Sequence, residues 1–419
     1  MTLRVRKRCA RVKSVCVVLE TLTWLLMLLC PAILEAQANL IPYRDGNAWG
    51  FCDRQEKVVI PAKYQYVDRF FGGYARVKTG GRFGLVDAKG RLVAKPVYEN
   101  VQDVFEGRFA VEANGLWGFA DVGGRMIAKP AYDEVIHFSE GRAAVRKEDE
   151  WGFIDSDGEV VIPLKYSKAF GFKYGLAGVF IGNKAGFIDR SGKEVITIMY
   201  DEIPLRYDDM FSDSLSAVSL GGFWGFIDLK GHLVVPNVFD FVYAFSNELA
   251  GFKEGYKCGF IDRTGHVVVK PVYDAVYPFN DGLACVRNGA MAGYIDRHGK
   301  QIVAMEYTDA NSFNDDRARV GMDGKFGFVS TSGKLVVPLI YDGADDFHEG
   351  LAAVMKNGKW GFINKEGKVV IACRYDAATM FSAGIALVRH NGQFGYIGRN
   401  GTEYWAHTST AKLGPGSVP

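Results

Sequence analysis

A glycine recurs along this chain at an almost constant interval, and that interval constrains the fold more than any other feature. Eleven glycines, each followed by a hydrophobic pair, are spaced 34 residues apart, with a single step of 39. They are Gly50, Gly84, Gly118, Gly152, Gly186, Gly225, Gly259, Gly293, Gly327, Gly361 and Gly395. A fixed period of 20–50 residues is typical of repeat architectures. The chain is therefore interpreted as one structural unit copied eleven times.

Each copy carries turn signals at fixed distances from this anchor glycine. Asp lies three residues after it in the first eight copies, from Asp53 to Asp296, and a second glycine lies six residues after it in ten of the eleven copies. Asp accepts backbone N–H groups and glycine readily adopts a positive φ, so Asp-x-x-Gly between two β-rich runs predicts a hairpin turn. These turns also explain a glycine content of 50 in 419 residues, against an average of about 7%.

The tenth copy shows the expected secondary structure most clearly. Four β-rich runs cover residues 344–347, 351–355, 360–364 and 368–372, and they are separated by Glu-Gly or Asn-Gly turns. No stretch after residue 40 shows sustained helical periodicity. One such unit cannot bury its aromatic side chains alone, so neighbouring copies must cover them. The predicted fold class is all-β, an eleven-copy array of 34-residue, propeller-like, four-stranded units.

The repeated motif resembles the bacterial WG-repeat family, whose units carry W-G-F-I-D, a turn, V-I-P, Y-D and then F-x-E-G-L-A. The match is strong at residues 151–155 with 161–163, and at residues 347–352. It is weaker where Ala185, Cys258 or Ala292 replaces the tryptophan. The resemblance covers the whole chain after its leader. It implies a repeat scaffold and no particular activity.

Two architectures fit the repeat. The strand order is similar to that of a propeller blade, whereas the short period favours an open β-solenoid, because four-stranded blades usually take about 40 residues. A five-residue insertion between residues 201 and 213 separates five copies from six, so a subdivision of the array there is also considered. The array is assigned to residues 39–406, and residues 407–419 are predicted to be a disordered tail.

The first 38 residues have the pattern of a signal peptide. Six Lys or Arg residues and no acid occur in residues 1–13, an apolar run is densest at 22–34, and the segment ends in Ala36-Gln37-Ala38. Cleavage is predicted after Ala38. A buried helix and an uncleaved membrane anchor are the alternatives, but Glu20 interrupts the apolar stretch. We therefore expect an exported protein, periplasmic or extracellular, with no membrane span after cleavage.

Removing the leader reverses the sign of the net charge. The full chain is +2, but the leader has six basic residues and two glutamates, which leaves 44 basic and 46 acidic residues. A general nucleic-acid binder is expected to be basic. No nucleic-acid partner is therefore predicted.

Residues that could support catalysis or metal binding do not form a known motif. Four cysteines follow the leader, Cys52, Cys258, Cys285 and Cys373, at least 27 residues apart, so no C-x-x-C site exists. Free buried thiols are favoured, with disulfides left open in an oxidising compartment. The seven histidines show no metal-ligand spacing. No catalytic residue, metal or cofactor is predicted.

One repeated position is basic in most copies. Seven residues after the anchor glycine lie Lys57, Arg91, Arg125, Lys193, Lys300, Lys334 and Lys368, while Glu159, His232 and His266 occupy the same place elsewhere. A column of acidic residues lies fifteen after the glycine, including Asp201, Asp274, Asp342 and Asp376. The basic stripe is a weak candidate for binding an anionic polymer. The alternative is that these residues protect a solvated strand edge.

The function favoured by these patterns is an exported, non-enzymatic scaffold that presents an extended surface to a protein or an anionic glycan. The alternative is a propeller-type enzyme acting on envelope polysaccharide. Such an enzyme would need one copy to depart from the rest, and residues 201–209, rich in carboxylates, are its only candidate locus. A structural envelope component without a ligand is a third interpretation.

Overall fold

The structure, a computed structural model, describes residues 40–205 and 210–405, so the predicted leader and tail lie outside it. It divides into two compact units, one ending at Val97 and the other beginning at Tyr98. The first unit contains two sheets. Their strands are β1 (Ile41–Asp45), β2 (Ala48–Cys52), β3 (Val58–Tyr64), β4 (Tyr66–Val67), β5 (Tyr74–Thr79), β6 (Arg82–Asp87) and β7 (Leu92–Tyr98), the last of which reaches the boundary.

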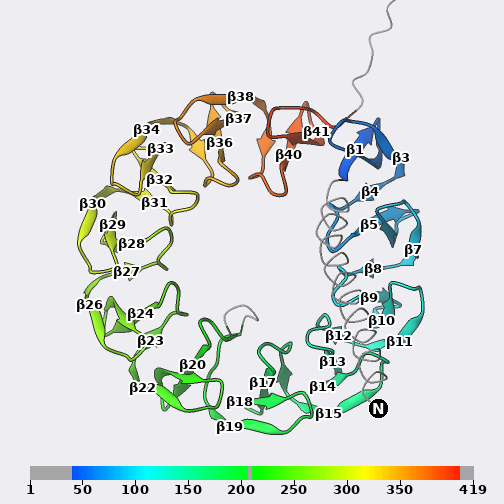
Figure 1. The fold of residues 1–419 in the computed structure, drawn as a ribbon, viewed down its shortest axis with the longest axis horizontal. Coiled ribbons are helices and arrows are strands. Elements are labelled where there is room, and N and C mark those ends of the chain that lie inside the picture. Colours follow the sequence, from blue (N-terminus) through cyan, green and yellow to red (C-terminus); the bar gives the residue numbers. More distant parts are fainter. Residues whose placement is uncertain (1–39, 206–209, 406–419) are drawn as a thin grey trace, which may run out of the picture. The chain divides into compact units, whose positions relative to one another are not determined.

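The second unit contains nine sheets, coloured cyan to red along the chain in Figure 1. The strands of its first four sheets are β8 (Asn100–Val101), β9 (Arg108–Ala113), β10 (Leu116–Asp121), β11 (Met126–Tyr132), β12 (Glu134–Val135), β13 (Ala143–Lys147), β14 (Glu150–Ile154), β15 (Val160–Tyr166), β16 (Lys168–Ala169), β17 (Leu176–Ile181), β18 (Lys184–Asp189), β19 (Glu194–Tyr200), β20 (Leu215–Leu220), β21 (Phe223–Asp228) and β22 (Leu233–Phe239).

Five further sheets complete this unit. Their strands are β23 (Phe241–Val242), β24 (Leu249–Glu254), β25 (Lys257–Asp262), β26 (Val267–Tyr273), β27 (Ala275–Val276), β28 (Leu283–Asn288), β29 (Met291–Asp296), β30 (Gln301–Tyr307), β31 (Asp309–Ala310), β32 (Arg317–Met322), β33 (Lys325–Ser330), β34 (Leu335–Tyr341), β35 (Gly343–Ala344), β36 (Leu351–Lys356), β37 (Lys359–Asn364), β38 (Val369–Tyr375), β39 (Ala377–Ala378), β40 (Ile385–His390) and β41 (Gln393–Gly398).

Every sheet is an antiparallel meander in which strands adjacent in sequence pair with each other, as in β35-β36-β37-β38. Within residues 40–205 and 210–405, eight of the eleven sheets have four strands and three have three. Strands of successive coils pair with one another in a β-solenoid, whereas here each sheet is complete within one repeat. The fold is therefore all-β with propeller-like units, as the repeat predicted.

The three-stranded sheets lie where the sequence departs from the repeat. The first, β1–β3, begins at Ile41, and residues 1–39 before it are outside the described ranges. The sheet β20–β22 follows the insertion, and an isolated bridge between Glu202 and Ser219 takes the place of its first strand. Side chains of β16–β19, of β20–β22 and of the segment between them form one buried cluster, which includes Phe187, Phe211 and Ile227. Packing is therefore continuous from one of these sheets to the next.

The strands predicted for the tenth copy are present, with one correction. Three of them correspond to β36, β37 and β38, but the first was wrong in extent, because β35 covers only Gly343–Ala344 and not residues 344–347. Beyond Ala344 the Asp345 amide still donates to the Ala353 carbonyl, and the chain then turns at a corner where His348 and Leu351 bond each other. This corner occupies the residues that were assigned to the strand.

In the first ten copies the anchor glycine is needed because the last strand of the sheet crosses directly over it, whereas in the eleventh copy the Trp405 side chain lies over Gly395. In the tenth copy, Trp360 pairs with Tyr375 and Phe362 pairs with Ile371, and a bulge lies between these two pairs. A Cβ atom on Gly361 would lie 2.5 Å from the Ile371 carbonyl oxygen and 2.6 Å from the Cys373 nitrogen. Only glycine allows the two backbones to approach this closely.

The hydrophobic core of the second unit lies between neighbouring sheets. In every copy of this unit except the last, the aromatic residue that follows the anchor glycine contacts an aromatic ring of the next sheet, with ring centroids 4.6–5.1 Å apart. The pairs are Phe119–Phe138, Phe153–Phe172, Phe187–Phe211, Phe226–Phe245, Phe260–Phe279, Tyr294–Phe313, Phe328–Phe347 and Phe362–Phe381. Edge-on and tilted aromatic pairs add stabilisation beyond the area they bury. Each repeat thus depends on its neighbours, as predicted.

The second repeated glycine also belongs to these junctions. Gly367, in the turn between β37 and β38, has a φ of +79°, and a Cβ there would contact Val337 of the preceding sheet at 3.2 Å. A side chain at this position would strain the turn and push the two sheets apart. Residues 40–205 and 210–405 contain no helix long and apolar enough to cross a membrane.

Candidate functional site

The repeated aspartate stabilises the hairpin turn between the third and fourth strands. In the copy around Gly259, the Asp262 Oδ1 atom accepts the Thr264 hydroxyl at 2.6 Å and the backbone N–H groups of Thr264 and His266 at 2.9 and 3.1 Å. These hydrogen bonds, the hydroxyl first, lower the pKa of Asp262. The predicted structural role of this aspartate is confirmed by these bonds.

The predicted basic stripe follows the same turns. All seven of its residues are exposed. Arg91 and Arg125 bind the aspartate of their own turn, with Nε–Oδ2 distances of 2.7 and 3.2 Å, and Arg125 also lies 3.4 Å from Asp157 in the next sheet. Within the described part of the chain, the other five form no ion pair: Lys57, Lys193, Lys300, Lys334 and Lys368. Binding of an anionic polymer by this stripe stays a prediction.

The acidic column links neighbouring sheets. Asp342 Oδ2 accepts the Asn357 amide in the hairpin of its own sheet at 2.7 Å, and its Oδ1 binds Lys325 of the preceding sheet at 2.5 Å. The hydrogen bond from Lys325 lowers the pKa of Asp342. The same lysine–aspartate contact recurs at Lys184–Asp201, Lys257–Asp274 and Lys359–Asp376. The acidic column therefore has structural partners built into the repeat.

A third repeated contact joins the corners that precede the second strand of each sheet. The Glu349 Oε2 atom accepts the Gly384 amide of the next sheet at 2.8 Å. Equivalent bonds join Glu106 to Gly141, Glu140 to Gly175, Asp281 to Asp316 and Asp315 to Gly350, at 2.7–2.9 Å. The acid of the F-x-E-G motif is therefore a link between sheets.

Two positions, one in the short first strand and one just after it, vary in chemistry between copies. Sixteen residues after the anchor glycine lie Tyr66, Asn100, Glu134, Lys168, Glu202, Phe241, Ala275, Asp309, Gly343 and Ala377. Eighteen residues after it lie Asp68, Gln102, Ile136, Phe170, Pro204, Tyr243, Tyr277, Asn311, Asp345 and Thr379. None of these is buried, whereas the residue between them is always Val, Ile or Ala and is mostly buried. We call positions 16 and 18 the variable positions.

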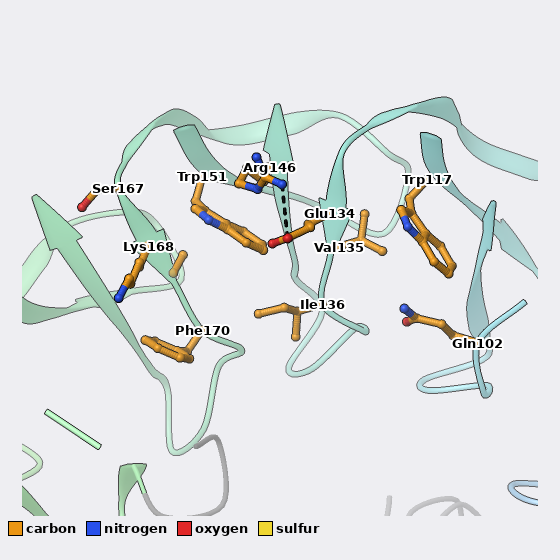
Figure 2. Close-up of a pocket in the computed structure, with 11 residues that line it drawn as sticks. Gln102, Trp117, Glu134, Val135, Ile136, Arg146, Trp151, Ser167, Lys168 and Phe170 are labelled. Atoms are coloured by element: carbon orange, nitrogen blue, oxygen red, sulfur yellow. Dashed lines mark ion pairs between the residues drawn. The ribbon is translucent and has the colours of Figure 1, made fainter. Parts of the chain in front are cut away.

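The variable positions of three neighbouring sheets meet in a groove of the second unit. The groove has a volume of about 630 Å³. It is lined by Gln102, Trp117, Glu134, Val135, Ile136, Arg146, Trp151, Ser167, Lys168, Ala169 and Phe170. Figure 2 shows Trp117 and Trp151 on opposite sides of residues 134–136 of β12 and the loop after it. This volume is within the range of small-molecule sites, about 300–1,000 Å³.

Polar groups accompany the apolar walls of this groove. Arg146 Nη2 lies 3.2 Å from Glu134 Oε1, the ion pair drawn in Figure 2, and the hydrogen bond from Arg146 to Glu134 raises the pKa of Arg146. The Glu134 side chain is 58% exposed and that of Arg146 is 25% exposed. The pair therefore remains accessible to a ligand.

The groove was not predicted from the sequence. The basic stripe drew attention to a position where most copies agree, whereas the groove is formed by positions where the copies differ. The signal in the sequence is that the residue between positions 16 and 18 is always Val, Ile or Ala. The residues at positions 16 and 18 themselves change, as Glu134 and Ile136 do beside Val135. Trp117 and Trp151 then mark the groove, because both precede an anchor glycine in adjacent copies.

The residues considered for catalysis have structural contacts or lie outside the structure. Asp201 binds Lys184 and accepts the Gly221 amide at 2.7 Å, and residues 206–209 are outside the described ranges. All four cysteines are free; three are buried and Cys373 is half-buried. Within residues 40–205 and 210–405, no group of three or more His, Cys, Asp or Glu side chains could hold a metal ion.

Similar solved structures are distant. A eukaryotic initiation factor aligns at 12% identity over 79% of this chain and 94% of that one, with a TM-score of 0.45. Hsv2p of Kluyveromyces lactis aligns at 10% identity over 55% and 91%, with a TM-score of 0.30. BamB from Moraxella catarrhalis aligns at 13% identity over 64% and 95%, with a TM-score of 0.31. No curated protein matches the chain.

The sequence itself matches a repeat family, described as WG containing repeat, in ten ranges. They are residues 49–83, 83–117, 117–151, 151–184, 186–222, 224–258, 259–290, 293–326, 326–360 and 360–394. Each range begins within a residue of an anchor glycine, so the family's repeat and the structural repeat coincide. Because these matches span most of the sequence, the chain belongs to the WG containing repeat family.

Proposed function

We propose that this protein is an exported, non-enzymatic scaffold that binds a protein or a glycan through the face formed by its variable positions. The observation that carries the proposal is the contrast between the constant residue that ends the short first strand and the variable residues on either side of it. The residue between positions 16 and 18 is always small or β-branched and apolar, while the two outward residues range from Lys and Asp to Phe and Gly. Accessible residues free to differ between copies suit recognition rather than folding.

The contacts between sheets support a scaffold role. Each kind of repeated acid has a partner. The turn aspartate Asp262 accepts backbone amides of its own turn, Asp342 of the acidic column binds a lysine of the preceding sheet, and the corner acid Glu349 accepts an amide of the next sheet. These groups are held by the repeat and are not free to act on a substrate. Stacked repeats present a long continuous surface, which is how many repeat proteins bind their partners.

Export is proposed from the leader alone. Its basic start, apolar run and Ala-x-Ala end are typical of a segment removed during secretion. Mass spectrometry of the protein purified from its native host should give a mature N-terminus at Asn39. A protein that retains residues 1–38 would contradict the proposed cleavage.

The binding role is tested by comparing two surfaces of the same protein. Mature protein is immobilised and exposed to a solubilised envelope fraction, beside a face variant (Lys168→Ser with Phe170→Ser) and a matched turn variant (Lys193→Ser with Lys334→Ser). We expect the face variant to lose retained material and the turn variant to keep it. Equal retention by both variants would refute the role of the face. Turnover of a glycan panel that is lost on Asp208→Asn and Asp209→Asn replacement would instead establish the enzyme alternative.

A further inference from the structure

We propose that the groove between Trp117, Trp151 and Lys168 binds a short stretch of a carboxylate-bearing oligosaccharide. The inference deepens the proposed function and rests on it, since it names the ligand class of one part of the same face. It is carried by three features of the groove: apolar walls, polar groups with hydrogen-bonding capacity left over, and a lysine that forms no ion pair within the described residues.

The walls of the groove suit the faces of pyranose rings. Trp117, Ile136 and Phe170 are partly exposed, and Trp151 remains 9% exposed. The two indoles come from β10 and β14, equivalent strands of neighbouring sheets, whereas Ala185 takes this place in the next copy. A sugar ring presents C–H groups on its faces, and these pack favourably against aromatic and aliphatic surfaces.

The edges of the groove suit hydroxyl groups. The Gln102 side-chain amide forms no hydrogen bond with residues 40–205 or 210–405, so both its donor and its acceptor are available. Ser167 donates to the Gly182 carbonyl at 3.0 Å and keeps its oxygen lone pairs. Glu134 uses one carboxylate oxygen for Arg146 and leaves the other open. An apolar peptide side chain would leave these groups unpaired, whereas a sugar can bond them through its hydroxyls.

The charge of the groove selects an acidic sugar over a neutral one. Lys168 is exposed and has no carboxylate within ion-pair distance in the described part of the protein, and its nearest recorded contact is the Phe180 ring, with the centroid 5.7 Å away. The charge of Arg146 is offset by Glu134. The groove therefore has one uncompensated positive charge, which a uronate carboxylate would neutralise.

The test uses a hexamer of α-1,4-linked galacturonic acid and its fully methyl-esterified form, with the mature protein and tryptophan fluorescence as the readout. We expect the acid to bind and to change the fluorescence, and the ester to bind more weakly. Lys168→Ser should weaken binding of the acid about fivefold, Lys168→Arg should restore it, and Lys193→Ser, an equally exposed lysine in a turn, should leave it unchanged. Gln102→Ala should weaken the binding of both the acid and the ester, because it removes a side chain that can hydrogen-bond a sugar hydroxyl.

Each contrary result has a separate meaning. Equal binding of acid and ester, or equal losses in Lys168→Ser and Lys193→Ser, would overturn the proposal, because either points to non-specific attraction. An acidic peptide with a leucine or phenylalanine that displaces the hexamer and binds more tightly would overturn it in favour of a protein partner. Absence of hexamer binding while envelope retention still depends on Lys168 and Phe170 would refute only this inference. If the hexamer did not bind and envelope retention did not depend on Lys168 and Phe170, the proposed function would be refuted as well.

Discussion

Replacing the anchor glycine Gly361 by alanine is the most direct test of how the repeat is built. The last strand of the sheet, β38, passes over Gly361 so closely that an added Cβ would lie 2.5 Å from the Ile371 carbonyl oxygen and 2.6 Å from the Cys373 nitrogen. Both obstacles are backbone atoms, which cannot rotate away as a side chain can. The substitution therefore requires β38 to move.

The expected cost follows from the size of that movement. A carbon and a backbone oxygen need a separation of about 3.2 Å or more, so β38 must shift by roughly 0.7 Å where it pairs with β37. Forced overpacking of this kind costs about 1–3 kcal/mol, and each weakened ladder hydrogen bond adds about 1 kcal/mol. We expect Gly361→Ala to destabilise this region by about 3 kcal/mol.

Gly343 provides a matched control in the same sheet. A Cβ there would meet side-chain atoms alone, with the Met355 Cε atom at 3.2 Å, the Met355 Cβ atom at 3.4 Å and the Trp360 ring at 3.5 Å, and the φ of Gly343 is not positive. The methionine can move aside, and alanine lowers the entropy of the unfolded chain. Gly343→Ala should therefore change stability by less than about 0.5 kcal/mol.

Hydrogen exchange is the appropriate assay, because stability in a repeat array is a sum of local and nearest-neighbour terms. Amides of β37 and β38 should exchange much faster in Gly361→Ala, while those of the sheet β23–β26 should be unaffected. Urea unfolding followed by tryptophan fluorescence would report the accompanying loss of stability. If Gly361→Ala and Gly343→Ala gave the same exchange rates in β38, the close-approach explanation of the anchor glycine would be refuted.

Three further predictions follow from the contacts between and within sheets. Phe381→Ala should cost about 3–4 kcal/mol, because its ring is 1% exposed, whereas Met380→Ala, at a side chain that is 43% exposed, should change the urea midpoint little. The pKa of Asp262 is lowered from 3.8, mainly by the Thr264 hydroxyl. The contribution of Asp262 to folding stability is therefore present above pH 3.8 and lost as the pH falls through the folded pKa. Asp262→Asn should show a smaller drop in urea midpoint between pH 7 and pH 3 than the unmodified protein. Glu349→Ala should cost about 1 kcal/mol and speed exchange of the Gly384 amide, while Glu349→Asp, the residue type found at this place in other sheets, should retain the bond.

The sequence predicted what depends on local chemistry within one repeat. Asp262 and Gly265 stand three residues apart between β-rich runs, and the resulting turn has the hydrogen bonds expected from those two residue types. The strand β36 and the strands after it were likewise located to within a few residues. Turn chemistry and alternation act over short distances, so a single copy is enough to show them.

Features that depend on two copies could not be predicted from one. Phe362 and Phe381 are nineteen residues apart and belong to different sheets, and only the packing of those sheets places their ring centroids 4.8 Å apart. Asp342 lies in the acidic column, but its contact with Lys325 depends on how the preceding sheet packs beside it. The repeat period predicted that copies stack, but only the structure shows which side chains meet at each junction.

The separation of constant from variable positions explains how one array can maintain its fold and still vary its surface. A change at Val135, the residue between the two variable positions, would disturb the packing between sheets, because that side chain packs against the core cluster around Phe119 and Phe138. A change at Glu134 or Ile136 alters only partly exposed atoms, and substitutions of that kind usually shift stability by no more than about 0.5 kcal/mol. The variable positions can therefore change their chemistry at little cost to folding. In this family member, a binding site is expected at the variable positions, where the copies differ, and not in the repeated motif itself.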